Sequence, residues 1–296
     1  SLKLDRFNFG CLYERFLLTQ SESDLSAWKE LMREEANNYH ELALDYAAAG
    51  CWKEAVDVLN QAVSGGFATP MTHYYIGWGG GLHLEEEAFK NAATACPDYC
   101  FPNRLEDILA LECATQYNSQ DAKAHYYLGN LWYDKRQYDL AVREWETSVE
   151  LDNQFPSAWR NLALAYFNKQ QRTEEALQCM EKAFALDSSD ARVLMELDQL
   201  YKRLGRPHAE RLAFLRKNSQ LIAQRDDLYL EQITLLNQVG EYEEARKLLD
   251  ARIFHPWEGG EGKVPAQYQI ARVELAKKCL QEKHSAEALN WLKECL

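Results

Sequence analysis

A glycine-rich segment near the carboxyl end of the sequence, residues 254–265, carries the residue types that acid–base chemistry needs. Glu258 and Glu261 lie three residues apart in it. They are flanked by His255 and Lys263. These groups could supply an acid, a base and electrostatic stabilisation, and the glycines would let the backbone approach a ligand. We predict no catalytic pair here, because a glycine loop does not set the separation of two carboxylates.

Two roles remain open for this segment. In the first, it is a ligand site or docking loop whose candidate residues are His255, Trp257, Glu258, Glu261 and Lys263. In the second, Trp257 plugs the apolar core of neighbouring helices, and the two glutamates bond nearby backbone or arginine groups. The glycines and prolines exclude a helix over these twelve residues.

The elements that must position this loop follow a repeated helical pattern. It is clearest in His125-x-x-Leu128-Gly129-x-x-Trp132 with Ala141-x-x-x-Trp145-x-x-Ser148, and in Trp159-x-x-Leu162-Ala163-x-x-Tyr166 with Ala176-x-x-x-Met180-x-x-Ala183. Small residues let two antiparallel helices approach, and large residues fill the space between successive hairpins. The pattern is that of the tetratricopeptide repeat. It predicts an all-α fold, a right-handed superhelical solenoid of tetratricopeptide-type helical hairpins.

Alanines in the second helix of each hairpin set the register of the array. They are Ala55, Ala88, Ala141, Ala176, Ala245 and Ala288. Their spacing predicts about seven hairpins over residues 36–296, with an extra helix near 102–117 and a loop insertion at 254–265. Residues 1–35 do not fit the repeat, and we expect a capping helix or an inter-domain segment there. Glycines that follow apolar-periodic segments predict left-handed helix ends at Gly50, Gly205 and Gly240.

The first helix of each hairpin is expected to line an inner groove. The groove residues this register selects are Tyr126, Asn130, Tyr133, Arg160, Phe167, Asn168, Lys202, Arg203 and Asn237. Amide side chains could bond an extended peptide backbone, and an arginine could bind a carboxylate through its two parallel N–H groups. The alternative is a solvated inner face that binds nothing by itself.

The short run Arg225-Asp226-Asp227 precedes a predicted helix. Aspartates there would cap the first turn and favour the helix dipole. A metal-binding carboxylate pair is the alternative, and we do not adopt it. The eight cysteines show no zinc-ligand or disulfide-framework spacing, so we predict no metal and no cofactor.

Charge and hydropathy exclude several classes of partner. The chain has 33 Lys and Arg residues against 46 Asp and Glu, a net charge of −13, which disfavours nucleic acid and anionic membranes. No apolar run is long enough for a bilayer span, and no signal peptide is evident, so we expect a cytoplasmic protein. Because the chain begins with Ser1 rather than Met, we expect a preceding segment to be missing.

Four segments are more specific than the general repeat: residues 125–135, 159–169, 225–229 and 254–263. They resemble the C-terminal half of a family of large bacterial proteins of uncharacterised function. In that family a β-rich N-terminal domain, similar to carbohydrate-active enzymes, precedes a tetratricopeptide array. The resemblance covers nearly the whole chain from about Phe7. It implies a cytoplasmic protein of sugar metabolism whose chemistry, if any, lies in the β domain.

The sequence therefore predicts an interaction module of a larger protein, and no enzyme activity in this segment. Its partner would be the missing β domain, or a separate protein or peptide, with carbohydrate bound through the parent protein. The alternative hypothesis is an accessory domain that completes the active site of a carbohydrate-active enzyme through the His255–Lys263 loop.

Overall fold

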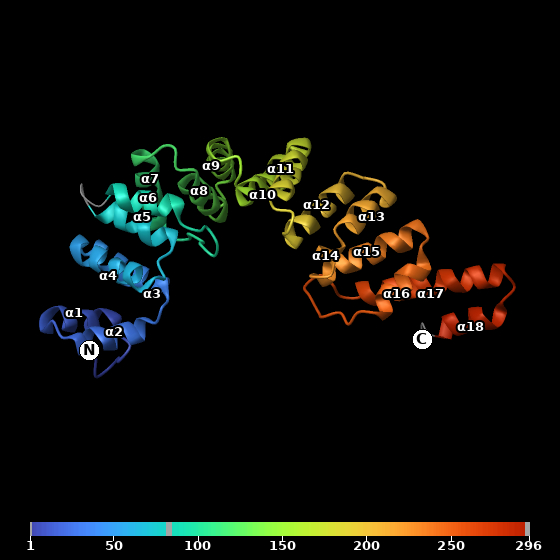
Figure 1. The fold of residues 1–296 in the computed structure, drawn as a ribbon, viewed down its shortest axis with the longest axis horizontal. Coiled ribbons are helices and arrows are strands. Elements are labelled where there is room, and N and C mark those ends of the chain that lie inside the picture. Colours follow the sequence, from blue (N-terminus) through green and yellow to red (C-terminus); the bar gives the residue numbers. More distant parts are fainter. Residues whose placement is uncertain (1, 81–84, 294–296) are drawn as a thin grey trace. The chain divides into compact units, whose positions relative to one another are not determined.

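The chain folds into two compact units, residues 1–170 and 171–296, called the N-terminal and C-terminal regions below. The computed structural model describes residues 2–80 and 85–293. All regular structure in these described residues is helical, and most successive helices are joined by short connections (Figure 1). The predicted all-α fold of tetratricopeptide-type hairpins is confirmed.

The N-terminal region holds ten α-helices and one π-helical segment among its described residues. Their bounds are α1 (Phe9–Thr19), α2 (Glu22–Met32), α3 (Ala36–Ala48), α4 (Trp52–Gly65), α5 (Pro70–Gly79), α6 (Glu85–Thr94), α7 (Leu105–Tyr117), α8 (Ala122–Asp134), α9 (Tyr138–Leu151), α10 (Pro156–Ala165) and the π-helix η2 (Tyr166–Gln170).

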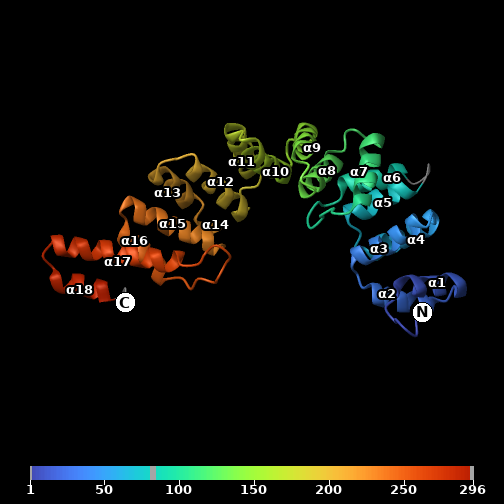
Figure 2. The same cartoon turned by 180° about the vertical axis from the view of Figure 1, so that it is seen from behind.

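The C-terminal region continues with α11 (Thr173–Leu186), α12 (Ala191–Arg203), α13 (His208–Lys217), α14 (Ser219–Ile222), α15 (Asp226–Val239), α16 (Tyr242–Asp250), α17 (Lys263–Gln281) and α18 (Ser285–Lys293). Helices α17 and α18 pack as a hairpin, visible from both sides of the molecule (Figures 1 and 2). The long connection between α16 and α17 is the glycine-rich segment singled out in the sequence.

Residues 9–32 form a helical hairpin, α1 with α2, and not a single capping helix. Aromatic contacts hold it together and join it to α3: the Tyr13 and Trp28 ring centroids of α1 and α2 are 4.7 Å apart, and those of Trp28 and Tyr39 of α3 are 5.3 Å apart. Trp28 is fully buried. Burying rings of this size covers the end of the N-terminal stack and supplies much of its apolar contact.

The small residues of the repeat lie where helices approach each other. All six second-helix alanines are buried. At Gly129 on α8 there is no room for a side chain, because an added Cβ would lie 2.4 Å from the Trp145 ring of α9. The residue that packs against Gly129 is therefore Trp145.

Helix ends follow the local rules in the sequence. Asp121 caps α8 by accepting from the N–H groups of Lys123 and Ala124, and Asp190 caps α12 in the same way. Gly50, Gly205 and Gly240 have φ of 79°, 71° and 86°, so the predicted left-handed helix ends are confirmed.

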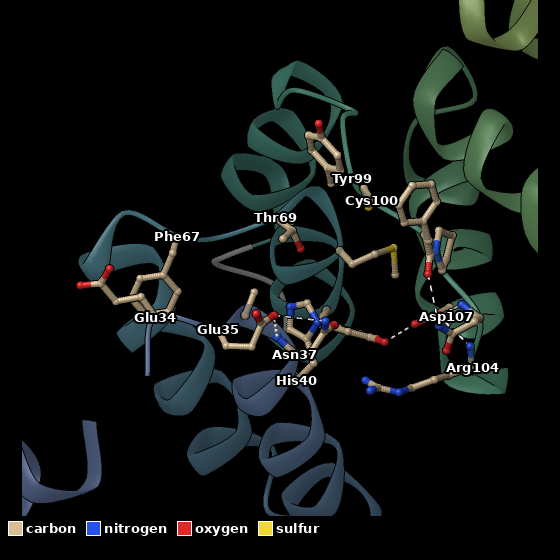
Figure 3. Close-up of a pocket in the computed structure, with 16 residues that line it drawn as sticks. Glu34, Glu35, Asn37, His40, Phe67, Thr69, Tyr99, Cys100, Arg104 and Asp107 are labelled. Atoms are coloured by element: carbon tan, nitrogen blue, oxygen red, sulfur yellow. Dashed lines mark hydrogen bonds between the residues drawn. The ribbon is translucent and has the colours of Figure 1, made fainter. Parts of the chain in front are cut away.

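Three connections between hairpins meet at one place in the N-terminal region (Figure 3). They are the α2–α3 link (residues 33–35), the α4–α5 link (66–69) and the α6–α7 link (95–104). Helix α7, in the stretch where the repeat spacing left room for an extra helix, packs on both α5 and α8. Side chains from all three links line a common cavity.

The loop insertion begins and ends three residues earlier than predicted from the sequence. Helix α17 begins at Lys263, so Pro265 lies inside its first turn, and the irregular segment spans residues 251–262. A proline is tolerated there because the N–H groups of a first turn have no intrahelical partner. The expectation that residues 263–265 belong to the loop was wrong for this reason.

Candidate functional site

The connection between α16 and α17 is tied to the start of α15 by one carboxylate. Asp226 accepts a 2.8 Å hydrogen bond from the backbone N–H of His255 and a 2.5 Å bond from Nε of Arg252. The His255 ring also lies 3.2 Å from the same carboxylate. Asp226 therefore holds the first residues of the loop against the C-terminal region.

Burial by itself would raise the pKa of Asp226. The hydrogen bonds from His255 and the Arg252 guanidinium outweigh that effect and hold the pKa of this carboxyl below its usual value. Asp226 is thus ionised at neutral pH, which keeps the tether charged. The prediction of an aspartate at the N-cap is wrong, since Arg225 is the N-cap residue. Both aspartates do lie in the first turn, as predicted, and Asp227 accepts from the backbone N–H of Leu228 and forms an ion pair with Arg225 at 2.7 Å. Within residues 2–80 and 85–293, no cluster of metal-binding side chains is present.

Beyond the tether, Trp257 turns back onto the hydrophobic core of the C-terminal region. Gly260 allows this packing, since a Cβ at that position would lie 2.4 Å from the Trp257 ring. Gly262 has a φ of 71°, which a residue with a side chain rarely adopts. The glycines thus shape the loop around the tryptophan, a role that the residue types alone did not indicate.

An open cavity of about 410 Å³ lies between this loop and the start of α17. Three aromatic side chains line it: Phe254, Trp257 and Tyr268. The Tyr268 hydroxyl donates a 2.8 Å hydrogen bond to the Leu249 carbonyl, which holds that ring in place. Concave, largely apolar pockets with a few polar groups at the edge are typical of binding sites.

The charged loop residues lie at the surface. Glu258, Glu261 and Lys263 are all exposed, and Glu261 lines the cavity. None of the three side chains has a hydrogen bond or ion pair with another described residue. The structure therefore contains features of both roles considered for the loop: Trp257 packs on the core, while the two glutamates stay available to a partner.

Two groove candidates on α8, Asn130 and Tyr126, contact residues of the neighbouring helices. The Asn130 side-chain oxygen accepts from the Trp145 indole N–H at 3.1 Å and from the Asn161 amide at 2.9 Å. The Tyr126 ring packs on Phe155 with 4.6 Å between ring centroids. Both candidates therefore contribute to packing between α8, α9 and α10.

One helical turn after Asn130 on α8, Tyr133 takes part in a cation–π cluster. The Lys169 ammonium lies 4.1 Å from the Tyr138 ring centroid and 5.8 Å from that of Tyr133. Phe167 and Asn168 share the π-helix η2 with Lys169, and Asn168 is exposed. The π-helix, often found at functional positions, was not foreseen. Arg160 donates to the neighbouring Asn161 side chain at 3.3 Å.

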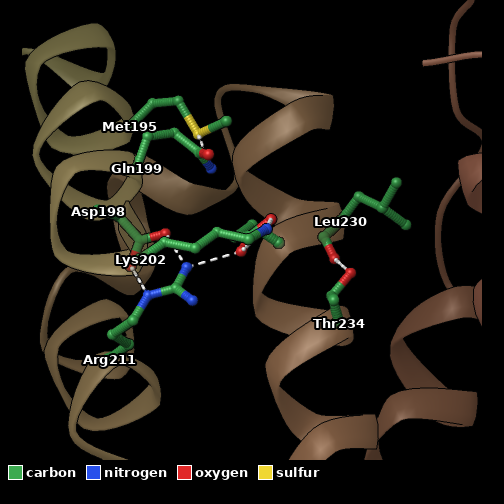
Figure 4. A network of polar contacts seen from close by, with 8 residues as sticks. Met195, Asp198, Gln199, Lys202, Arg211, Leu230 and Thr234 are labelled. Atoms are coloured by element: carbon green, nitrogen blue, oxygen red, sulfur yellow. Dashed lines mark hydrogen bonds and ion pairs between the residues drawn. The ribbon is translucent and has the colours of Figure 1, made fainter. Parts of the chain in front are cut away.

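In the C-terminal region, Lys202 belongs to an ion network between α12, α13 and α15 (Figure 4). Arg211, fully buried, donates to both Asp198 oxygens at 3.0 and 2.6 Å and to Glu231 at 2.6 Å. Lys202 completes the network with a 2.8 Å bond to Glu231. This network was missed because its bonded pairs are 13 to 29 residues apart in the sequence.

The two carboxylates of this network differ in pKa. For Glu231, burial raises the pKa, but Lys202 and Arg211 outweigh it and hold the pKa low. For Asp198, burial dominates and raises the pKa despite the Arg211 bonds.

Two further groove candidates lie on the helices that carry this network. Arg203 is exposed at the end of α12, and Asn237, buried, donates to the Gln267 carbonyl at 3.2 Å and side chain at 2.9 Å.

Comparison with known proteins supports the repeat assignment. The family model of the TPR (tetratricopeptide) repeat matches residues 129–170, from Gly129 on α8 to the end of η2. The chain contains a TPR repeat. The matched residues include the Gly129–Trp145 contact and the Asn130 bonds described above.

Among solved structures, the C-terminal part of a TPR repeat-containing protein from Cytophaga hutchinsonii is 17% identical, with a TM-score of 0.48 over 87% of this chain and 94% of that one. YrrB, described as a TPR protein with an unusual peptide-binding site, is 17% identical, with a TM-score of 0.46 over 63% of this chain and 90% of that one. Pseudomonas aeruginosa PilF is 20% identical, with a TM-score of 0.46 over 76% and 90%.

Among the described residues, no helix is both long enough and apolar enough to cross a bilayer.

Proposed function

We propose that this chain is a TPR interaction module of a larger protein, and that it binds a protein segment in the cavity beside the His255–Lys263 loop. The observation that carries the proposal is the open, aromatic-lined cavity of about 410 Å³. Its lining combines a Trp257 ring held by the core with an exposed Glu261 that has no partner among the described residues.

The chemistry of the walls indicates what the segment must offer. Phe254, Trp257 and Tyr268 favour apolar or proline-containing residues, because aromatic-lined grooves bind extended chains through ring faces. Glu261 at the edge favours a neighbouring positive charge. The segment comes from another domain of the parent protein or from a separate protein, and the sugar-metabolism context of the parent rests on the sequence resemblance alone.

The test selects ligands without assuming a partner. A displayed library of random peptides is panned on the whole chain, and the binding of selected peptides is then measured by calorimetry. We expect apolar or proline-containing sequences with a basic residue. Val264→Glu, which places a charge in the cavity wall, should weaken their binding about tenfold or more, because the carboxylate is desolvated on binding.

Gln269→Glu is the matched control, since Gln269 is exposed on α17 outside the cavity. It adds the same charge to the same helix and should leave binding unchanged. Circular dichroism of both variants checks the fold. Peptides that bind Val264→Glu as tightly as the native chain would place the interaction elsewhere and refute the cavity as the docking site.

A second candidate function is favoured by the exposed, unpaired Glu258 and Glu261. In it, the loop completes the active site of a carbohydrate-active parent enzyme. Glu258→Gln and Glu261→Gln are then introduced into the full-length parent, and turnover and domain assembly are both measured. A large loss of turnover with unchanged assembly supports the active-site role, and weakened assembly supports docking. Unchanged turnover contradicts the active-site role.

A further inference from the structure

The cavity formed by the three links of the N-terminal region has a volume of about 260 Å³ (Figure 3). We propose that this cavity binds the arginine side chain of a basic protein segment. The proposal is independent of the loop cavity in the C-terminal region, because it concerns other residues and another ligand chemistry.

Polar groups on the floor of the cavity are already satisfied. The buried His40 ring bonds the Thr72 hydroxyl at 2.8 Å. The Tyr75 hydroxyl donates to Asp107, which also accepts from the backbone N–H groups of Asn103 at 2.7 Å and Arg104 at 2.9 Å. The floor is therefore rigid, and a ligand need not break these bonds to enter.

The floor also carries no competing positive charge from histidine. Burial, with a smaller contribution from Arg104, lowers the pKa of His40 to about 3, so the ring is neutral at physiological pH. The Arg104 guanidinium, the one cation among the described lining residues, bonds Glu41. Its charge is thereby offset by a carboxylate outside the cavity.

The wall formed by the α2–α3 link carries negative charge that no described cation balances. Glu34 and Glu35 come from the α2–α3 link and line the cavity; both are exposed. The Glu35 carboxylate accepts only from the Asn37 backbone and amide, at 3.5 and 3.2 Å, and neither glutamate forms an ion pair with a described residue. A cationic ligand would pair with these carboxylates, whereas an anion would be repelled by them.

Aromatic rings complete the cavity on the other sides. Phe67 comes from the α4–α5 link, and Tyr99 and Phe101 come from the α6–α7 link. Tyr99 and Phe101 are 92% and 75% exposed, which is unusual for large rings. A guanidinium stacks on such faces while its N–H fork bonds a carboxylate, so the combination favours arginine over the more strongly hydrated lysine ammonium.

Backbone strain is concentrated in two of the links. Arg33, next to Glu34, has a φ of 53°, and Tyr99 has a φ of 57°. Such values cost energy for residues other than glycine, and they persist where the surroundings require them. Here they set the course of the links that carry the glutamates and the exposed tyrosine.

The surface beside the cavity indicates that the ligand is part of a protein chain. Beyond Phe101, Leu105 and Leu109 are 68% and 52% exposed on one face of α7. An apolar residue next to the arginine would cover them. A segment that carries arginine between leucines therefore matches both the cavity and this face in charge and in polarity.

The experiment uses a blocked five-residue peptide with arginine between two leucines, and the same peptide with citrulline, the neutral isostere. Both are titrated into the whole chain and followed by NMR. We expect the arginine peptide to shift resonances of the three links. The citrulline peptide should bind about tenfold more weakly, and raised salt should weaken only the arginine peptide.

Variants then test the walls. Glu34→Gln with Glu35→Gln should weaken the arginine peptide about tenfold, while Glu30→Gln, an exposed glutamate outside the cavity, should not. Tyr99→Asn removes the ring and retains a residue that tolerates positive φ, and it should weaken binding severalfold. Val264→Glu, which alters the loop cavity of the C-terminal region, should leave the binding of the arginine peptide unchanged.

Equal binding of the arginine and citrulline peptides would overturn the proposal. So would no detectable binding, or binding that the double glutamine variant leaves unchanged. Circular dichroism shows whether each variant is folded, and because the three wall residues are exposed, loss of binding with an unchanged spectrum reports the site itself.

Discussion

The two regions of the chain balance their buried carboxylates in different ways. In the N-terminal region, Asp107 and Asp121 are bonded by tyrosine hydroxyls, from Tyr75 and from Tyr74 at 3.0 Å, together with backbone N–H groups. In the C-terminal region, Asp198 and Glu231 are bonded by Arg211, with Lys202 as a second cation.

The difference shows what each arrangement holds together. Tyr74 and Tyr75 are neighbours on α5, and their partners lie in the first turn of α7 and at the N-cap of α8. Each tyrosine thus fixes a helix start that the aspartate already caps. Arg211 instead joins three helices, and no other donor of equal charge is buried with it. The C-terminal network should therefore be the more costly one to break.

The largest expected effect is the loss of Arg211. Arg211→Ala leaves Asp198 and Glu231 buried without their main cation, and we expect a loss of about 3–5 kcal/mol in the free energy of unfolding. Urea denaturation followed by circular dichroism measures it. Arg216→Ala, which removes an exposed arginine paired with Glu241 and Glu244, is the control, and should cost at most about 1 kcal/mol. Equal costs would contradict the comparison.

A smaller effect is expected for the tyrosine arrangement. Tyr74→Phe removes one donor from Asp121, which retains the N–H groups of Lys123 and Ala124. The expected loss is about 1.5–3 kcal/mol by the same denaturation measurement. Tyr126→Phe, whose hydroxyl has no hydrogen bond to a described residue, should change stability by less than about 0.5 kcal/mol. A Tyr74→Phe cost as large as that of Arg211→Ala would remove the distinction between the regions.

The regions should also differ in their response to acid. The folded pKa of His40, about 3, lies below the unfolded value of about 6.5, so its contribution to stability is present above pH 6.5 and lost as pH falls toward 3. The expected slope is about 1.4 kcal/mol per pH unit in that window. Denaturation at pH 7, 6 and 5 measures it, and His40→Gln should flatten the profile.

Carboxylates in the C-terminal region should make the free energy of unfolding depend on pH in a more acidic range. The lowered pKa values of Glu231 and Asp226 give stability that is present above their unfolded values and lost only as pH falls below about 4. The raised pKa of Asp198 acts in the opposite sense. A loss between pH 7 and 5 that is as steep in His40→Gln as in the native chain would contradict the assignment of this window to His40.

The smallest expected effect concerns the loop tether. Asp226→Asn weakens the bonds to Arg252 and His255 at the surface, and should cost about 1 kcal/mol or less in global stability. Hydrogen exchange of residues 251–262 should nevertheless become faster, because the loop opens without unfolding of the helices. Unchanged exchange there would show that Trp257 packing alone holds the loop.

The repeat pattern predicted the helices well, because its signals are local. The spacing of Ala55, Ala141 and Ala245 and the glycines at helix ends depend on the helical period and on backbone conformation, which neighbouring residues set. The residue that packs on Gly129 could not be predicted in this way, because it is Trp145 of the next helix.

The candidate sites were only partly predictable for the same reason. The glycine loop was recognisable from its residue types. Its tether to Asp226 was not, since 29 residues separate this aspartate from His255. Asn130 was selected for a groove, yet its oxygen bonds Trp145 and Asn161. Nothing in the sequence indicated that Glu34, Phe67 and Tyr99 would line one cavity.

The sequence by itself determined the all-α repeat, the helix ends and the excess of negative charge, because helix period, capping and net charge are local or additive properties. Only the tertiary structure decided which buried carboxylate meets a tyrosine and which meets an arginine. It also decided which links meet to form a cavity. Those pairings depend on the packing of helices far apart in the chain, where a polar group loses water and must find its partner in whichever element lies beside it.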